Sequence, residues 1–293
     1  MPCANIETPS GPIEFNYNIS TPSDANATSI DESLPTILLL HSCYFGSVSF
    51  HNQLNDPNVR KYNCIIFDAR AHGKSWGDLP RNWSPAMAAE DAVLLLDALG
   101  IEKVHLYGVQ MGSLTAMHVA ILYPERCLST HLLSPLSVRE SEDVRLGKEE
   151  IAECWEQGLD DPQAQGDAVF GALQLAFSHN LGTLGHAAVK RSKETREQNM
   201  AGDFRVLTID FFNDANRHLY SKEGFSRVKC PVKLTFCTGD IAYTLEQSEE
   251  LLRLMQSAGV DASLNQVEGC HYGNVENPTG CVSSRAFVRP GRS

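Results

Sequence analysis

The chain has 293 residues, and its 36 acidic and 24 basic side chains give a formal net charge of −12 at neutral pH. An acidic surface repels the phosphates of nucleic acids and of anionic lipids, so neither is expected as a partner. With 42% hydrophobic and 20% charged residues, the composition is that of a globular protein whose core needs no metal or disulfide for stability.

Signals for export or membrane insertion are missing from the sequence. Residues 1–5 have neither the basic head nor the apolar stretch of a secretory signal, and the longest aliphatic run, 37–40, is far too short to cross a bilayer. The nine cysteines show no C-x-x-C spacing, which is typical of free thiols in a reducing compartment. We therefore expect a cytoplasmic protein.

Apolar runs alternate with amphipathic stretches at both ends of the chain. Residues 11–36 show the pattern of an edge hairpin with a polar loop. Six short aliphatic runs bounded by turn residues predict buried strands, namely 36–40, 62–67, 104–108, 128–133, 232–236 and 262–267. Helices are predicted over 86–99, 112–122 and 245–257. Strands that alternate with helices predict an α/β fold with a mostly parallel sheet covered on both faces.

The middle of the chain differs, because residues 137–227 show no strand pattern. Four helical stretches are predicted there, over 148–157, 164–179, 184–200 and 204–216. We interpret this block as an inserted four-helix cap over one end of the sheet, with residues 1–136 and 228–293 forming the core. Most aromatic side chains of the cap are expected to pack its own interior, and some are expected to face a pocket beneath it.

One motif should carry chemistry, and it lacks the usual atom. Gly108-Val109-Gln110-Met111-Gly112 follows a predicted strand and opens a helix, which is the arrangement of the G-x-S-x-G turn with glutamine in place of serine. The flanking glycines allow a tight turn that raises the central side chain above the sheet. Two glycines spaced four residues apart are common by chance, so the neighbouring motifs decide the interpretation.

Those motifs resemble the α/β-hydrolase superfamily of the helical-cap type along nearly the whole chain. The segments that carry the resemblance are Leu38-Leu39-Leu40-His41-Ser42, Asp68-Ala69-Arg70-Ala71-His72-Gly73-Lys74-Ser75, Cys237-Thr238-Gly239-Asp240 and Gly269-Cys270-His271. The resemblance implies an eight-stranded-type sheet, with Asp240 as the acid and His271 as the base of the site. It also implies that the backbone N–H groups of Met111 and of Cys43 or Ser42 form the oxyanion hole. Ser42 and Ala71 replace glycines that are usual in the family.

Glutamine closes the ordinary covalent route, because a primary amide has no proton that imidazole can remove at neutral pH. Gln110 can instead hold a water or clamp a substrate carbonyl while His271 and Asp240 act as a general base. Cys43 and Ser42 are less favoured substitute nucleophiles. We expect the pocket to include His41, Tyr44, Trp155, Phe177, Phe211 and Phe212.

Three functional hypotheses follow from these residues. The first is a cofactor-free, hydrolase-like enzyme that acts on a small apolar ester, lactone or other carbonyl compound. The second uses the same His–Asp pair for non-hydrolytic chemistry, such as elimination, isomerisation, cyclisation or cofactor-free oxygenation. The third is a ligand-binding protein without activity. No phosphate-binding loop and no Cys/His spacing typical of metal ligands is present, so neither a cofactor nor a metal is expected, and the oligomeric state stays open.

Overall fold

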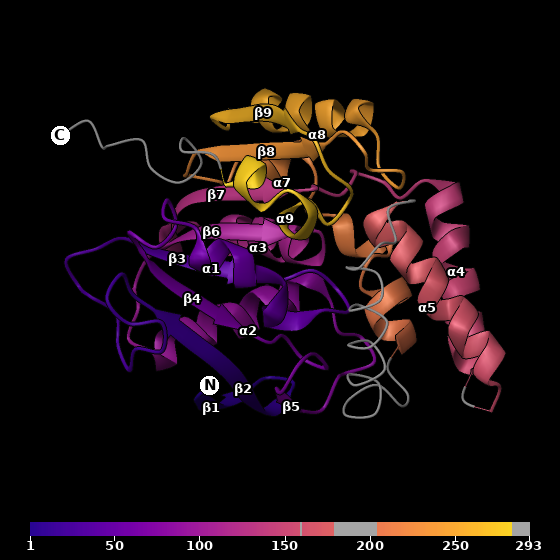
Figure 1. Cartoon of the computed structure of the whole chain (residues 1–293). Helices are drawn as coiled ribbons and strands as arrows, with labels where there is room; N and C mark the ends of the chain where they lie inside the picture. The colour runs from indigo at the N-terminus through magenta and orange to yellow at the C-terminus, as the bar shows by residue number, and fades with distance from the viewer. Residues whose placement is uncertain (159, 179–203, 283–293) are drawn as a thin grey trace.

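The computed structural model describes residues 1–158, 160–178 and 204–282, and within them nine strands form a single sheet (Figure 1). The strands are β1 (Cys3–Thr8), β2 (Gly11–Ser20), β3 (Thr36–Leu40), β4 (Asn63–Phe67), β5 (Trp76–Gly77), β6 (Val104–Val109), β7 (Cys127–Leu133), β8 (Val232–Cys237) and β9 (Ala262–Val267). Their order is β1-β2-β4-β3-β6-β7-β8-β9, with β5 paired to β2. The strands from β4 to β9 along this order pair in parallel. The predicted α/β architecture is confirmed.

The predicted hairpin near the N-terminus is wrong in its pairing. β2 pairs antiparallel with β1 and with β4, and its return segment contributes only an isolated bridge between Ile19 and Ala27 within the described residues. Residues 21–35 instead connect β2 to β3. β1 was missed because Ile6 is its one buried side chain, so its hydrophobic alternation is weak.

The sheet is buried on both faces, which explains its continuous aliphatic strands. Leu38 and Leu40 of β3 belong to the hydrophobic cluster on the face that α2 (Pro85–Ala98), α3 (Met111–Leu122) and α8 (Leu245–Ser257) cover. Ile37 and Leu39 point to the other face, where they pack with residues around α1 (His51–Asn55) and α10 (Pro278–Cys281). Figure 1 shows α2, α3 and α8 behind the sheet and α1 and α9 (Gly273–Glu276) in front.

The three core helices begin and end within one residue of their predicted bounds. Ser84 caps α2 by accepting a hydrogen bond from the Met87 N–H, and Pro85 occupies the first helical position. Thr244 and Gln247 form a reciprocal capping box at the start of α8. These local signals were visible in the sequence, and packing against the sheet completes them.

The segment between β7 and β8 contains α4 (Glu142–Gln157), α5 (Pro162–Phe177) and α7 (Lys222–Phe225). α4 and α5 lie side by side beyond one end of the strands (Figure 1). α4 begins six residues before the predicted 148, because Ser141 caps it. The predicted helix 184–200 and residue 179 lie outside the described residues. Residues 204–216 do not form one regular helix: a π-helical turn over Val206–Asp210 is followed by a 3₁₀ turn over Asp214–Arg217, which Asn213 caps. The division into core and cap stays a prediction.

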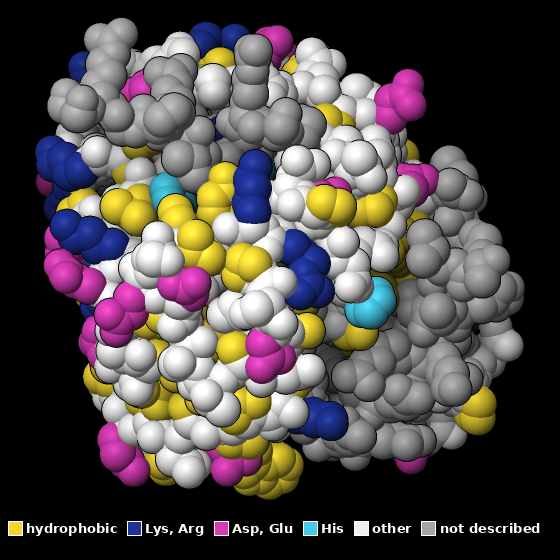
Figure 2. Space-filling model, turned by 60° about the vertical axis from the view of Figure 1, so that its left-hand side comes forward, with side chains coloured by type: hydrophobic (Ala, Val, Ile, Leu, Met, Phe, Trp, Pro, Cys, Tyr) yellow, Lys and Arg dark blue, Asp and Glu magenta, His cyan; other side chains and the backbone are white. Residues whose placement is uncertain are grey.

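On one face of the molecule (Figure 2), the charged side chains of the described residues are not segregated by sign. Acidic and basic side chains are interspersed with hydrophobic ones on the face shown in Figure 2. In the described part of the chain, no helix is both long and apolar enough to cross a bilayer. A search of the same residues finds no group of three His, Cys, Asp or Glu side chains placed to hold a metal ion.

Candidate active site

The turn between β6 and α3 holds Gln110 in a strained backbone conformation, with φ 51° and ψ −108°. Non-glycine residues adopt such angles at a cost of order 1–3 kcal/mol and mostly at functional sites. The two glycines make the turn possible. A Cβ on Gly108 would overlap the Gly112 carbonyl, and one on Gly112 would overlap the Leu40 carbonyl. The strand–turn–helix geometry expected of a nucleophile turn is therefore present.

The side chain of Gln110 places its own carbonyl oxygen at the two backbone donors that are predicted to form an oxyanion hole. Gln110 Oε1 accepts hydrogen bonds from the backbone N–H of Met111, at 2.7 Å, and of Cys43, at 3.0 Å. These are the two backbone donors expected for a substrate oxyanion, and the donor from the loop is Cys43 rather than Ser42. Sequence reasoning could not have found this contact, because it depends on the rotamer of Gln110.

His271 and Asp240 form the expected pair, with 2.6 Å between His271 Nδ1 and Asp240 Oδ2. The second carboxylate oxygen of Asp240 accepts the backbone N–H groups of Ala242 and Tyr243, at 2.8 and 3.0 Å. The Tyr243 ring stacks on the imidazole, with 5.1 Å between ring centroids. Asp240 therefore holds the histidine in one orientation, with the Nδ1 proton shared and Nε2 left as the basic nitrogen.

Gln110 and His271 line the same narrow cavity, whose free volume is about 20 Å³, close to the space that one water molecule needs. Tyr44 and Phe212, two of the predicted pocket residues, also line this cavity. The remaining walls come mainly from small or apolar residues of α4 and α5 and from the loops after β8 and β9, namely Val144, Lys148, Ala172, Leu175, Ala176, Thr208, Ala242, Tyr243 and Tyr272. The cavity, whose walls are mostly apolar, thus contains both the proposed base and the glutamine.

Three aromatic residues expected in the pocket do not line this cavity. Trp155 stacks on Phe204, Phe177 packs edge-on against Phe45 and Tyr272, and Phe211 packs on Trp83. All three are buried. They form the interior between helices and core, because large rings gain most free energy where they leave water completely.

The substitute nucleophiles are poorly placed for attack. Burial raises the pKa of the Cys43 thiol to about 12, so it is protonated at neutral pH. Tyr272, next to His271, donates from its hydroxyl to the Cys43 carbonyl and so fixes the loop rather than the sulfur. Ser42, the other predicted substitute, is fully buried and does not line the cavity that His271 lines.

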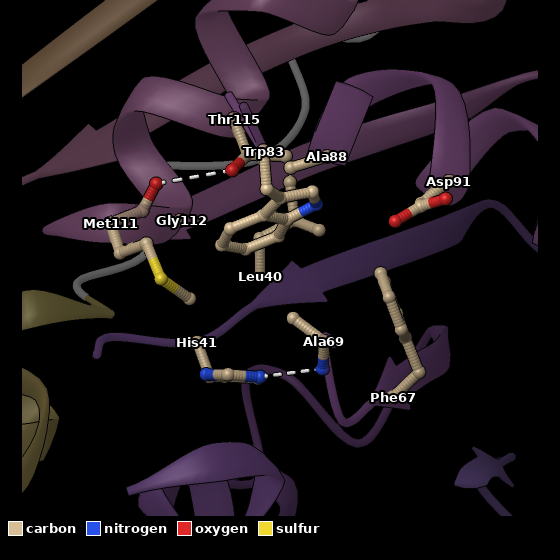
Figure 3. A pocket seen from close by; sticks show the side chains of 10 residues that line it. All are labelled: Leu40, His41, Phe67, Ala69, Trp83, Ala88, Asp91, Met111, Gly112 and Thr115. Atoms are coloured by element: carbon tan, nitrogen blue, oxygen red, sulfur yellow. Dashed lines mark hydrogen bonds between the residues drawn. The ribbon is translucent and has the colours of Figure 1, made fainter. Parts of the chain in front are cut away.

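His41 is not in the dyad cavity but lines a separate one behind the turn, with Trp83 and Met111 (Figure 3). Its Nε2 accepts the Ala69 N–H at 2.9 Å, and its Nδ1 faces the Ser42 carbonyl at 2.8 Å. His72 makes the same pair of contacts to the Tyr44 N–H and the Arg70 carbonyl. Each ring must be neutral to accept at Nε2. These two histidines therefore hold the loop that supplies the Cys43 donor.

Acid is expected to destabilise the fold through its buried histidines. Burial lowers the pKa of His41, and burial together with His41 lowers that of His72 to about 3. The unfolded chain, whose histidines have a pKa of about 6.5, binds more protons over this window, so the free energy of unfolding falls as the pH falls below that value. His72 alone predicts a loss of roughly 2 kcal/mol between about pH 7.5 and pH 5. Urea unfolding at the two pH values measures this, and H72Q should make the dependence shallower by about one proton. An unfolding free energy that stays constant over this range would contradict it.

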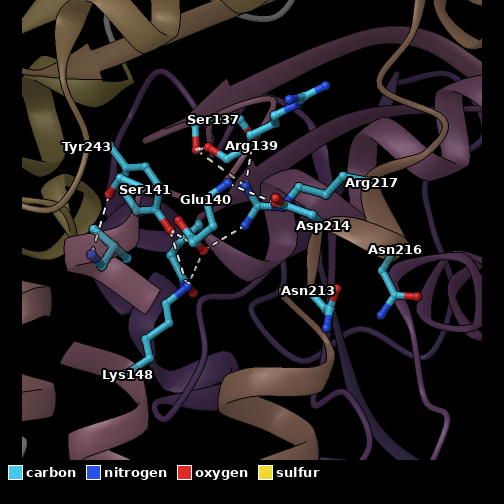
Figure 4. Close-up of polar contacts among 12 residues, drawn as sticks. Ser137, Arg139, Glu140, Ser141, Lys148, Asn213, Asp214, Asn216, Arg217 and Tyr243 are labelled. Carbon is cyan, nitrogen blue, oxygen red and sulfur yellow. Dashed lines mark hydrogen bonds and ion pairs between the residues drawn. The ribbon is translucent and has the colours of Figure 1, made fainter. Parts of the chain in front are cut away.

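A buried ion cluster lies beside the cavity and was not anticipated (Figure 4). Glu140 Oε2 contacts Lys148 Nζ at 2.6 Å and Arg217 at 2.8 Å, and it accepts the Tyr243 hydroxyl at 3.2 Å. Burial alone would raise the pKa of Glu140, but the two cations bring it below its ordinary value. Because Tyr243 also stacks on His271, the cluster ties the segment after β7 to the dyad. The sequence signal was weak: charged residues in an amphipathic helix usually face solvent.

Removing the carboxylate of this cluster should destabilise the protein strongly. E140Q leaves Lys148 and Arg217 buried without a counter-charge, which typically costs about 3–5 kcal/mol. The matched control is E142Q. Glu142 is solvent-exposed and pairs with Arg145 within α4, so the loss of its charge should change the free energy of unfolding little. Chemical denaturation of both variants measures the difference. Equal stabilities would show that Glu140 does not hold the cluster together.

Comparison with known proteins supports the predicted superfamily. A family model described as the alpha/beta hydrolase fold matches residues 35–221. The chain belongs to the α/β-hydrolase fold family. The match places it among α/β-hydrolase-type enzymes, as the turn, the acid and the histidine had suggested.

Similar proteins within this family include lactone- and ester-cleaving enzymes by name. The chain is 24% identical over 218 residues to 3-oxoadipate enol-lactonase 1 of Acinetobacter baylyi, covering 74% of this chain and 75% of that protein. It is 33% identical over 106 residues to the uncharacterized carboxylesterase nap of Bacillus subtilis, covering 36% of this chain and 34% of that protein. The structure of the enol-lactonase from Burkholderia xenovorans LB400 superimposes with a TM-score of 0.74 at 16% identity, covering 96% and 98% of the two chains, and this likeness concerns the fold alone.

Proposed function

We propose that this hydrolase-fold chain cleaves a small, largely apolar ester or lactone by direct attack of water, without an acyl-enzyme. The observation that carries the proposal is the contact between His271 and Asp240, at 2.6 Å, with His271 in the same cavity as Gln110. The enol-lactonase name of the Acinetobacter relative supports the choice of a lactone. The apolar walls of the cavity support a small neutral acyl or alkyl group.

In the proposed reaction, His271 Nε2 removes a proton from water as the water oxygen attacks the substrate carbonyl carbon. Asp240 stabilises the imidazolium that forms. The substrate oxygen takes the N–H groups of Met111 and Cys43, so the Gln110 carbonyl has to leave the hole when the substrate enters. The leaving alkoxide then receives the proton from His271. The displaced carboxamide retains two N–H donors with which to orient the substrate.

A labelled-water experiment tests this reaction. The chain is incubated in H₂¹⁸O with a panel of simple lactones and aryl esters, and the acid products are examined by mass spectrometry. Hydrolysis predicts one ¹⁸O in the carboxylate and no burst of alcohol in rapid mixing, because no acyl-enzyme accumulates. A burst matching the enzyme concentration would contradict direct attack. Substrates recovered unchanged throughout would favour a binding protein.

The filled oxyanion hole favours a second candidate, in which the pair removes a proton from a carbon atom of the substrate. Such a reaction needs the base but does not need the Gln110 carbonyl to move. Elimination, isomerisation and cyclisation belong to this class. Their products would carry no oxygen from labelled water, so the same experiment separates the two candidates.

A further inference from the structure

We propose that Gln110 is a self-modification site, at which the protein hydrolyses its own side-chain carboxamide to the carboxylate of glutamate and releases ammonia. The proposal goes beyond hydrolysis of an external substrate. It shares with the proposed function the basic role of His271 and the N–H donors of Met111 and Cys43.

The first support is the position of the carboxamide. Its oxygen sits between the Met111 and Cys43 N–H groups, at 2.7 and 3.0 Å, where the oxygen of a substrate would lie. Donors placed in this way stabilise the negative charge that develops on a carbonyl oxygen when its carbon is attacked. The amide of Gln110 is therefore held by these two donors in the same way as the carbonyl group of an acyl substrate would be.

The second support is the nearby base. Gln110 and His271 line one cavity, and the Nδ1 contact with Asp240 leaves Nε2 as the basic nitrogen. Tyr44, Thr208, Tyr243 and Lys148 line the same cavity, whose free volume of about 20 Å³ is close to the space that one water molecule needs. The backbone turn and the two hydrogen bonds hold the amide in place, so the reaction needs little reorientation.

The step balances with water as the only co-reactant. His271 Nε2 accepts a proton from water while the water oxygen forms a bond to Cδ of Gln110, and the charge passes to Oε1. The C–N bond then breaks as the nitrogen takes the proton from the imidazolium, which releases ammonia and leaves a carboxylic acid. That acid ionises at neutral pH. The carboxylate retains both N–H donors and is not an electrophile, so the modification ends there.

The tryptic fragment 104–126 makes a sharp experiment possible, because Gln110 is its only glutamine and it contains no asparagine. Fresh protein is kept at physiological temperature in ordinary water or in H₂¹⁸O, then digested and weighed. Conversion of amide to acid raises the fragment mass by about 1 Da, and an oxygen from labelled water adds about 2 Da more. The fragment 234–253 is the matched control, since Gln247 is its only glutamine and it also lacks asparagine.

We expect fragment 104–126 to gain this mass with time, or to be isolated already converted, while fragment 234–253 stays unchanged. H271A and D240N should retain the original mass of fragment 104–126, and far-ultraviolet circular dichroism should show that both are folded. An unconverted fragment in the parent protein, or conversion at the same rate in H271A, would overturn the proposal. No external substrate enters this assay, so a failure here leaves the lactone proposal standing, and unlabelled lactone products would leave this one standing.

Discussion

Replacing Gln110 by serine is expected to raise the hydrolysis of aryl esters by on the order of 10²–10⁴-fold in kcat/KM. The variant places a hydroxyl on a turn that already has the required backbone geometry, in the cavity that His271 lines. It also empties the oxyanion hole, because serine is too short to place its own oxygen between the Met111 and Cys43 N–H groups in the manner of Gln110. Both effects act on the transition state.

The measurement is steady-state and rapid-mixing hydrolysis of a nitrophenyl ester, where an acyl-enzyme shows as a burst of nitrophenol. Two controls separate the causes. Q110A empties the hole without a nucleophile, so its gain should be smaller and without a burst. The double variant Q110S/H271A should lose most of the gain. A serine variant no faster than the alanine variant would mean that His271 cannot reach residue 110.

Loss of the base should abolish most of the parent activity. H271A is expected to lower kcat on the true substrate by on the order of 10²–10⁴-fold, because His271 is the proton acceptor of the proposed chemistry and no other imidazole or carboxylate is among the described residues that line the cavity. The effect should fall on kcat rather than on KM, since the imidazole assists the reacting water and contributes little to binding.

D240N tests the same pair through its orientation. An amide can donate to Nδ1 and so favours the wrong tautomer, and we expect a loss of similar order without loss of folding. H51A is the control, because His51 is an exposed histidine away from the cavity. Unchanged turnover in H271A would remove the general base from both proposed reactions.

The sequence predicted the scaffold well because its signals are local. The parallel strands and core helices have continuous aliphatic runs, proline or hydroxyl caps and glycine ends, and each agrees with the packing that completes it. β1 was missed because an edge strand with one buried side chain resembles a polar loop. Residues 204–216 follow a helical periodicity, but Asn213 caps a separate 3₁₀ turn there and so interrupts the predicted helix.

The positions of the site residues along the backbone could be predicted from the sequence, whereas the orientations of the surrounding side chains could not. Gln110, Asp240 and His271 stand at strand ends, so their convergence follows from topology, and the structure brings Gln110 and His271 to one cavity. Whether an aromatic ring faces that cavity or the interior depends on packing between distant segments. Trp155 and Phe211 could not be separated from Phe212 on periodicity alone. The Glu140 cluster likewise depends on Arg217, which lies far along the chain.

The conformation of the turn at residue 110 is imposed by its neighbours, because the small glycines and the Leu40 carbonyl set the path of the backbone. The central side chain contributes little to that path. We therefore expect an exchange of this side chain to change the reactivity of the site more than the path of the backbone. One substitution at position 110 then suffices to give this turn a different chemistry.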